Sequence, residues 1–440
     1  MPLQGLHSGR SLKVPSGSLV VQKYGGSSVA DPEGIRRVAG RVAAAHIAGH
    51  QVVVVVSAMG DTTDELLELA TRVAPSPRSK DVDALLTTGE RISTSVLAIA
   101  LASLGIPSRT FSGSKAGLIT DGTHRNAHIV DVQPAKIQAC LDHGAVAIVA
   151  GFQGRSRKKG KITTLGRGGS DLTAVALAAA LGAAVCEIYT DVDGVFTADP
   201  RVVPRARKID SISSDEMLEL AASGAKVLNL RCVEYARRFS VCIHVRSSFT
   251  MDEGTLIVPA IHDPAAGPRT PSKEQPVITG VVRERSTAKI TVAGAPNDAA
   301  GISLVFGVLA GTNANVDMIV QNTSSDGADR MDLTFTVRAA DGPRVVEALE
   351  GARQIIGFHR LHYDEQIGKL SLVGLGMRSD PHVVAKFFKA LSAAGINVEL
   401  ISTSEVRITV VTRAAQLDEA ARAVDAAFHL SPRQEALTLR

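Results

Sequence analysis

The stretch TTLGRGGSDLTAVALAAALGAAVCEIYTDVDGVFTADPR, residues 163–201, decides the fold of this chain. A glycine-rich turn is followed by Ser170 and Asp171, where N-capping residues of a helix belong, and then by an apolar helix to about Leu181. A buried strand and a loop with Asp–Gly and Asp–Pro breaks come next. Backbone N–H groups in such a turn close on an anion, and the helix dipole adds to the attraction. The stretch therefore predicts a phosphate site at a strand end of an α/β fold.

Short apolar runs and helical patterns alternate on both sides of this stretch. Continuous apolar runs are typical of strands that are covered on both faces of a largely parallel sheet. We therefore predict a doubly wound α/β domain at residues 19–249. The expected strands lie at 19–24, 51–58, 145–151, 186–191 and 241–247, and the expected helices at 34–49, 63–74, 89–105, 134–144, 172–182 and 213–224.

Composition indicates a globular protein with more than one domain. The net charge is only +4, aromatic residues make up 3% and Trp is absent, so we expect no nucleic-acid partner. Residues 1–18 lack a secretory apolar region and are expected to be a disordered tail, and no apolar run reaches transmembrane length. The four cysteines have no metal-type spacing, which favours buried free thiols and a cytoplasmic location.

The C-terminal part contains an internal repeat. Residues 250–276 are rich in Pro, Gly and small polar residues and should form a linker. Beyond them, KITVAG and SLVFGVLAGTNANVDMIVQ match KLSLVGLG and KFFKALSAAGINVELIST, with Asn315 and Asn397 separated by 82 positions (397 − 315). Each copy reads as a small ferredoxin-like α+β module. We place the modules at residues 277–366 and 367–440.

Six motifs in order resemble one known family. KYGGSS, SAMGDTTDELLELA, TTGERIS, GFQG, TTLGRGGSD and YTDVDGVFTADPR together resemble the amino-acid kinase family, and within it the aspartate kinases. The resemblance implies phosphoryl transfer from ATP to the side-chain carboxylate of L-aspartate, giving 4-phospho-L-aspartate, the first step towards lysine, threonine and methionine. It also implies that the two modules are paired ACT domains, which sense amino acids such as lysine and threonine and form a homodimer or larger assembly.

Charged residues near the glycine turns are the catalytic candidates. Phosphoryl transfer needs positive charge around the transferred group. Lys23 ends a strand beside two glycines, and Lys226 matches the family's nucleotide-phosphate lysine. Asp171 is expected to hold lysine ammonium groups or to cap its helix. A carboxylate nucleophile needs no base, because it is ionised at neutral pH.

The amino-acid substrate requires a cation for its α-carboxylate and an anion for its ammonium group. Arg167 offers the bidentate fork for the carboxylate. Glu90 matches the ammonium site, although Thr87 three residues earlier also fits a capping box. By resemblance the remaining substrate positions are Ser57, Asp61, Thr62, Thr63, Phe152, Gly168, Gly169 and Ser170.

ATP positions follow from the same resemblance. We expect Mg²⁺ to arrive with ATP and to be held mainly by phosphates and water, and we predict no protein metal site. The basic run RSRKKGK, residues 155–161, is expected to tip a solvated hairpin; an electrostatic funnel for ATP is the alternative. The ATP positions are Lys23, Tyr24, Gly25, Gly26, Ser57, Ser170, Thr190, Asp191, Phe196, Thr197, Ala198, Asp199, Pro200, Arg201 and Lys226.

The effector loops depart from the family pattern. The usual Pro-Gly at the first module's helix start is Ala299-Ala300, and the second module keeps Pro381 but has His382 in place of glycine. Side chains at these turns restrict the backbone, so we expect weakened feedback control. The effector positions are Asn297, Asp298, Ala300, Asn315, Gln321, Asn322, Asn397, Ser402, Thr403 and Glu405.

Two alternatives to an aspartate kinase stay open at this point. One is a kinase for another amino-acid carboxylate, and the other is a non-catalytic amino-acid sensor. Retention of Lys23, Asp171, Arg167 and Lys226 together argues against the sensor, because a scaffold has no physical need of them.

Overall fold

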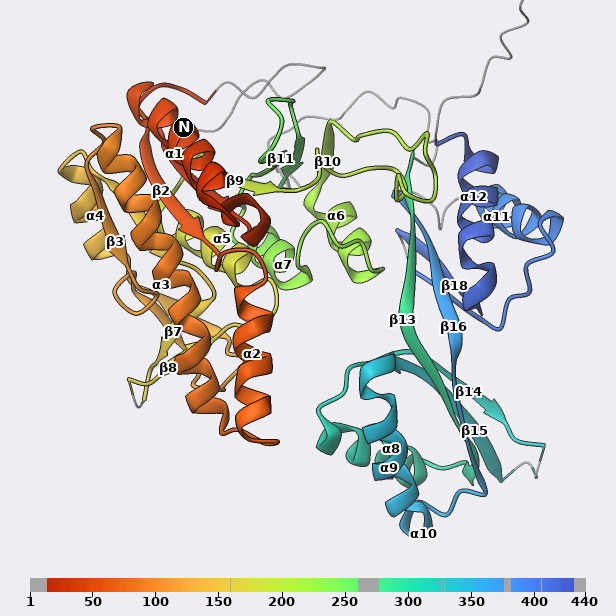
Figure 1. Ribbon diagram of the computed structural model, residues 1–440. Helices are drawn as coiled ribbons and strands as arrows, with labels where there is room; N and C mark the ends of the chain where they lie inside the picture. The colour runs from red at the N-terminus through yellow and green to blue at the C-terminus, as the bar shows by residue number, and fades with distance from the viewer. Residues whose placement is uncertain are drawn as a thin grey trace, which may run out of the picture. The chain divides into compact units, whose positions relative to one another are not determined.

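The computed structural model describes residues 14–158, 160–259, 277–325, 327, 329–375, 381–404 and 406–430 (Figure 1). These residues form two compact units. The first contains residues 14–195, 208–221 and 226–259. The second contains residues 196–207, 222–225 and the described residues from 277 onward. The second unit therefore includes two short segments from within the predicted catalytic domain.

An eight-stranded sheet forms the centre of the first unit, in the order β10-β12-β11-β9-β1-β2-β6-β3. Neighbouring strands are parallel except for β11 and β12. The predicted doubly wound, largely parallel fold is confirmed. The strands are β1 (Leu19–Tyr24), β2 (Gln51–Val56), β3 (Ser108–Phe111), β6 (Val146–Ala150), β9 (Val185–Thr190), β10 (Ser211–Ser213), β11 (Ile243–Ser247) and β12 (Thr255–Val258).

Helices cover both faces of this sheet. Val52, Val54 and Val56 of β2 share one hydrophobic core with α1 and α3, which lie side by side (Figure 1). Alternate side chains of a strand point to opposite faces, and Lys23, next to Tyr24 of that core, instead reaches α5. The helices are α1 (Pro32–Ile47), α2 (Thr62–Val73), α3 (Ser79–Ser103), α4 (Ala135–Asp142), α5 (Gly169–Leu181), α6 (Ser214–Ala222) and α7 (Leu230–Arg238).

A smaller four-stranded sheet has the order β5-β4-β7-β8. Its strands are β4 (Leu118–Thr120), β5 (Ile129–Val132), β7 (Gln153–Ser156) and β8 (Ile162–Thr164). β7 and β8 pair as an antiparallel hairpin. The described residues of the basic run, 155–158, 160 and 161, lie at the tip of this hairpin, as predicted.

Three expectations for the first unit were wrong. Thr255–Val258 lie in the predicted linker but form β12, because their backbone pairs with β10 and β11 in the main sheet. α3 begins at Ser79 rather than Gly89. The expectation that no apolar run reaches transmembrane length was also wrong, because α3 is long and apolar enough to cross a membrane by length and composition. In the structure it packs against α1, β3, β6 and β8 as a core helix.

All four cysteines lie among the described residues and are free and buried. Burial raises the pKa of the Cys186 and Cys232 thiols well above the usual value. The prediction of buried free thiols is confirmed.

The second unit is built on a six-stranded sheet in the order β14-β15-β13-β16-β18-β17. The repeat is visible in its helices, since α8 begins at Ala299 and α11 begins at Pro381, again 82 positions apart (381 − 299). The elements are β13 (Val277–Pro296), α8 (Ala299–Thr312), β14 (Val316–Thr323), β15 (Arg330–Arg338), α9 (Gly342–Gly351), α10 (Arg353–Ile356), β16 (Arg360–Leu375), α11 (Pro381–Ala393), β17 (Leu400–Thr403), β18 (Arg407–Arg413) and α12 (Leu417–Phe428).

The long strand β13 serves both modules. Its second half packs Ile290 and Val292 into a core with α8 and α9. Its first half pairs with the end of β16 and places Val281 in the core of α11 and α12. The predicted division of the modules between residues 366 and 367 therefore leaves out part of the second module, because that module also contains the beginning of β13.

Candidate active site

The carboxyl ends of β1, β2 and β9 lie side by side because the three strands are parallel neighbours. Tyr24 is in register with both Val56 and Tyr189. Beyond the strands, Gly25 N–H donates to the carbonyl of Tyr189 at 3.3 Å, and Ser57 N–H donates to the carbonyl of Tyr24 at 3.1 Å. The segments that follow β1 and β2 therefore lie beside the end of β9, at the carboxyl edge of the sheet.

Lys23 and Asp171 form an ion pair at this edge. Lys23 lies near the end of β1, Asp171 lies in the first turn of α5, and Nζ is 2.6 Å from Oδ1. Their side chains are only 11% and 12% exposed. A carboxylate in this position holds the ammonium group in place through a charge-assisted hydrogen bond.

Residues Ser170 and Asp171 do not cap α5, contrary to the sequence prediction. The N-cap is Gly168, in the left-handed conformation with φ of 74°, and the helix begins at Gly169. Ser170 and Asp171 therefore lie in the first helical turn. This placement directs the Asp171 carboxylate to Lys23 instead of to the helix backbone.

The glycine turn is fastened by α7, a helix that the sequence patterns did not predict. Asn229 caps α7 and donates from Nδ2 to the carbonyl of Arg167 at 2.9 Å. A Cβ on Gly168 would lie 2.4 Å from the Asn229 Cβ. Arg231 donates to the carbonyl of Leu165 at 2.7 Å. Asn229 before an apolar residue is an N-cap signal that sequence reasoning could have used.

Small residues allow the other loops to approach closely. A Cβ on Gly26 would lie 2.7 Å from the carbonyl oxygen of Gly60. A Cβ on Gly151 would lie 2.7 Å from Ser170 Oγ. Phe152 has a φ of 71°, and its N–H donates to Thr173 of α5.

Three more predicted substrate positions follow β2 at the start of α2. Asp61 is the exposed N-cap of α2, and Thr62 and Thr63 are half-buried in its first turn.

Glu90 is a buried carboxylate within α3. It is 2% exposed, and its Oε2 has no hydrogen-bond partner among the described residues. Burial raises its pKa to about 7, although the backbone N–H groups of Glu90 itself and of Ala58 oppose the rise. The capping-box alternative was wrong, because α3 begins eleven positions earlier (90 − 79) and Thr87 Oγ1 donates to the carbonyl of Ala84. An orphaned buried carboxylate is suited to an ammonium ligand.

Arg167 and Lys226 are both exposed. The Arg167 side chain is 92% exposed and lies 3.8 Å from Asp64. Lys226 lies in the chain between α6 and α7. Among the described contacts, neither of these side chains reaches the Lys23–Asp171 pair. The roles of Arg167 and Lys226 therefore stay predictions.

The predicted ATP segment is divided between the two units. Thr190 ends β9, and its hydroxyl donates to Asp191. Phe196, Thr197, Ala198, Asp199, Pro200 and Arg201 belong to the second unit. There the carboxylate of Asp199 accepts hydrogen bonds from the Arg201 guanidinium, and these bonds lower the pKa of Asp199. Among the described residues no three His, Cys, Asp or Glu side chains are grouped to hold a metal.

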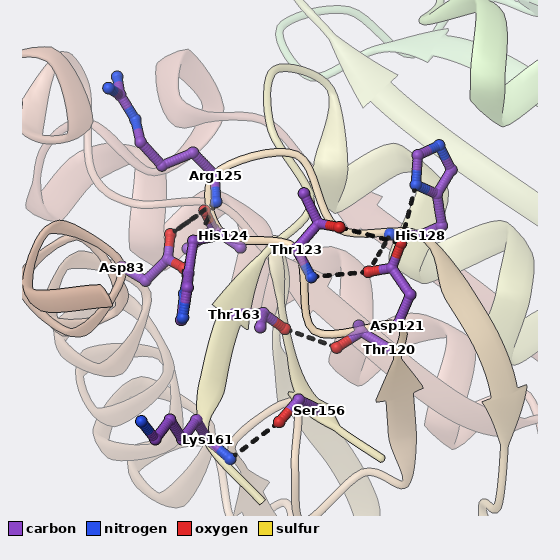
Figure 2. Close-up of polar contacts among 11 residues, drawn as sticks. Asp83, Thr120, Asp121, Thr123, His124, Arg125, His128, Ser156, Lys161 and Thr163 are labelled. Atoms are coloured by element: carbon purple, nitrogen blue, oxygen red, sulfur yellow. Dashed lines mark hydrogen bonds and ion pairs between the residues drawn. The ribbon is translucent and has the colours of Figure 1, made fainter. Parts of the chain in front are cut away.

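The buried contacts of Asp83 were not predicted from the sequence patterns, and Figure 2 shows its carboxylate beside His124 and Arg125. Asp83 is fully buried in α3, and its carboxylate accepts from Thr164 Oγ1 at 2.6 Å and from the Arg125 N–H at 3.1 Å. His124 Nδ1 lies 2.5 Å away. Thr164 lies two residues before Gly166 of the glycine turn, so Asp83 connects the segment that leads into that turn to the helix that carries Glu90.

The predicted effector residues lie in the second unit. Asp298 caps α8 by accepting from Gly301 N–H at 2.6 Å, and Gln321 of β14 donates to Asn297 at 2.9 Å. Ala300 lies in the first turn of α8. Asn322 lies on β14, Asn315 directly precedes β14, Asn397 accepts at its carbonyl from Thr412, and Ser402 and Thr403 lie on β17. Glu405 lies outside the described residues.

The comparisons with known proteins agree with this fold and these motifs. A model of the amino acid kinase family matches residues 18–247, and an ACT domain model matches residues 370–428. The first unit thus belongs to the class of α/β phosphotransferases called amino acid kinases. Aspartokinases of Mycobacterium tuberculosis and Thermus thermophilus are 55% and 46% identical to the chain, over 95% and 94% of it and 98% and 99% of the relatives. The chain therefore belongs to the aspartokinase family.

Solved structures show the same architecture. A crystal structure of E. coli aspartokinase III in complex with aspartate and ADP has a TM-score of 0.77 at 24% identity, covering 93% of this chain and 100% of the other. At that identity the likeness shows the fold. An aspartate kinase structure from Synechocystis is 36% identical with a TM-score of 0.51, covering 94% of this chain and 70% of the other.

Proposed function

We propose that the chain transfers the γ-phosphoryl group of ATP to the side-chain carboxylate of L-aspartate, giving 4-phospho-L-aspartate and ADP. The observation that carries the proposal is the buried Lys23–Asp171 pair at the sheet edge, together with the orphaned carboxylate of Glu90. The aspartokinase relatives support the choice of substrate. The experiments below distinguish this activity from two alternatives: a kinase for another amino-acid carboxylate, and a non-catalytic sensor.

In this proposal Lys23 supplies positive charge to the phosphoryl group during transfer. The transition state spreads negative charge over the phosphoryl oxygens, so a preorganised ammonium group lowers its energy. Asp171 holds that ammonium group in place. The backbone of Gly26 and the N-terminus of α5 would cradle the phosphates, and Lys226 would reach them from its exposed position.

Glu90 and Arg167 would bind the two charged ends of the amino acid. Glu90 pairs with the ammonium group, which satisfies its free Oε2. The exposed guanidinium of Arg167 provides the fork for the α-carboxylate. Between them the side-chain carboxylate attacks as an anion and needs no general base.

Magnesium fits this site only as a companion of ATP. The described residues contain no grouped set of protein ligands, and Mg²⁺ is commonly held by phosphates, waters and few carboxylates. When bound with ATP it would neutralise phosphate charge. We place the activity in the cytoplasm, at the entry to lysine, threonine and methionine synthesis.

Assembly through the second unit is part of the proposal. The edge strands β14 and β17 carry Ile319 and Ile401, which occupy matching repeat positions and are both about half exposed. Unpaired edges with apolar residues favour association. We infer a homodimer or larger assembly, and a monomer mass in light scattering at micromolar concentration would contradict it.

Aspartate binding should weaken as the pH falls through about 7. Burial raises the pKa of Glu90 to about 7, and only the ionised carboxylate forms an ion pair with the substrate ammonium. One pH unit below that pKa, the apparent KM for aspartate should be about tenfold higher, while the KM for ATP stays level. Kinetics between pH 6 and 8 measure both constants. A flat aspartate KM across this range would remove the assigned role of Glu90.

Feedback inhibition by lysine plus threonine should be weak. Ala299 and Ala300 place methyl groups at the start of α8. Gly301 does not replace the usual glycine by a shift of one residue, because its N–H already donates to the Asp298 side chain. Inhibition at millimolar effector is the measurement, with Ala299→Pro/Ala300→Gly expected to strengthen it. Strong wild-type inhibition that the double variant leaves unchanged would show these residues to be neutral.

A further inference from the structure

Residues 196–207 connect β9 to β10 in the first unit's chain order, yet they belong to the second unit. This segment, called here the 196–207 loop, includes the predicted ATP residues Phe196–Arg201. The loop contacts the part of the second unit that contains the beginning of β13.

The loop is joined to β13 through its backbone. Val281 N–H donates to the carbonyl of Thr197 at 2.7 Å. A Cβ on Gly280 would lie 2.6 Å from the same oxygen and 3.2 Å from its carbonyl carbon. The two main chains thus approach so closely that only glycine fits at position 280. The loop is also closed on itself, since Thr197 N–H donates to the carbonyl of Arg207 at 2.9 Å.

Charged side chains reinforce this junction. Arg283 of β13 donates to Asp199 Oδ2 at 3.0 Å, with the two side chains 19% and 26% exposed. Arg283 also lies 3.4 Å from Asp418 of α12. Arg207 Nε donates to the carbonyl of Leu430 at 2.6 Å, and Val202 packs against the core of the second module. The loop is therefore anchored to β13 and to Leu430, which follows α12.

We propose that Arg283 is a positioning residue for ATP, acting through Asp199 by holding the 196–207 loop in its binding conformation. This inference rests on the proposed assignment of residues 196–201 to ATP. A loop that is ordered before binding loses less conformational entropy when the ligand arrives. Arg283 therefore affects the affinity for nucleotide and leaves the chemical step unchanged.

Arg285 offers a matched control two residues along the same strand. Its guanidinium also pairs with Asp418, at 2.8 Å, and donates to the carbonyl of Ala414, but no contact of Arg285 reaches Asp199. Arg283→Ala should raise the KM for ATP by about three- to tenfold, the range of a charge-assisted hydrogen bond that is partly exposed. Arg285→Ala should change it less than about twofold. For both variants kcat and the KM for aspartate should stay within about twofold of wild type.

A double-mutant cycle completes the test. Asp199→Ala should raise the KM for ATP at least as much as Arg283→Ala, because it removes the hydrogen bonds from Arg201 as well as the one from Arg283. The double variant should be no worse than the poorer single variant, because the Arg283–Asp199 contact is already lost in each single variant. Arg283→Lys, which keeps the charge, should restore part of the affinity. Equal ATP KM values for Arg283→Ala and Arg285→Ala, or additive effects in the cycle, would overturn the proposal. If neither Asp199→Ala nor Arg283→Ala changes the ATP KM, the assignment of residues 196–201 to ATP also fails, whereas the catalytic role of Lys23 is judged by its own variant.

Discussion

Lys23→Ala is expected to lower kcat by at least about a hundredfold, the cost of losing one preorganised group that stabilises transition-state charge. The substitution removes the ammonium group that Asp171 holds at 2.6 Å. The KM values should change much less than kcat, because the lost interaction strengthens in the transition state. Steady-state kinetics with saturating aspartate measure the effect.

A control separates this role from stability. The variant leaves Asp171 without its partner in a largely buried place, so some loss of stability is expected, and thermal unfolding must show a folded protein at the assay temperature. Lys161 at the exposed tip of the β7–β8 hairpin offers a matched lysine. Lys161→Ala should leave kcat unchanged. A Lys23→Ala enzyme that keeps more than about a tenth of wild-type turnover would refute the assignment.

Glu90→Gln is expected to raise the KM for aspartate by about 10- to 100-fold, since a contact between ionised groups is replaced by one with a neutral amide. The KM for ATP should stay near the wild-type value. Glutamine keeps the volume of the buried side chain, so packing in α3 is preserved. The variant should also lose the rise of aspartate KM at low pH, because the group that titrates near 7 is gone.

Glu68 on the exposed face of α2 provides the control for charge alone. Glu68→Gln should leave both constants unchanged. Equal increases in the two KM values for Glu90→Gln would indicate that Glu90 supports the structure of the site rather than the ammonium group.

The main sheet was predictable from sequence because its strands are buried on both faces. β2 reads QVVVVV, and five of its six residues are fully covered. Short or partly exposed strands such as β3, with the sequence SRTF, carry no such signal. β12 was missed because its few apolar residues lie among Pro, Gly and polar residues, and its place in the sheet depends on pairing with distant strands.

The candidate site was predictable where motifs are local. The glycine turn, Lys23 and Asp171 stand in recognisable short patterns, and the parallel strands bring them together. Long-range contacts left no local trace. Asp83 meets Thr164 across 81 positions, and Arg283 meets Asp199 across 84. A single charged residue within a helix or strand does not reveal such a partner.

The most direct test of the proposed function is to incubate the purified chain with MgATP, L-aspartate and hydroxylamine, and to measure hydroxamate and ADP together. An acyl phosphate reacts with hydroxylamine, so aspartate should give hydroxamate and ADP in equal amounts. Succinate, which has the two carboxylates but no ammonium group for Glu90, should give far less of both. Absence of aspartate hydroxamate from the folded wild-type chain, or equal yields with succinate, would contradict the account.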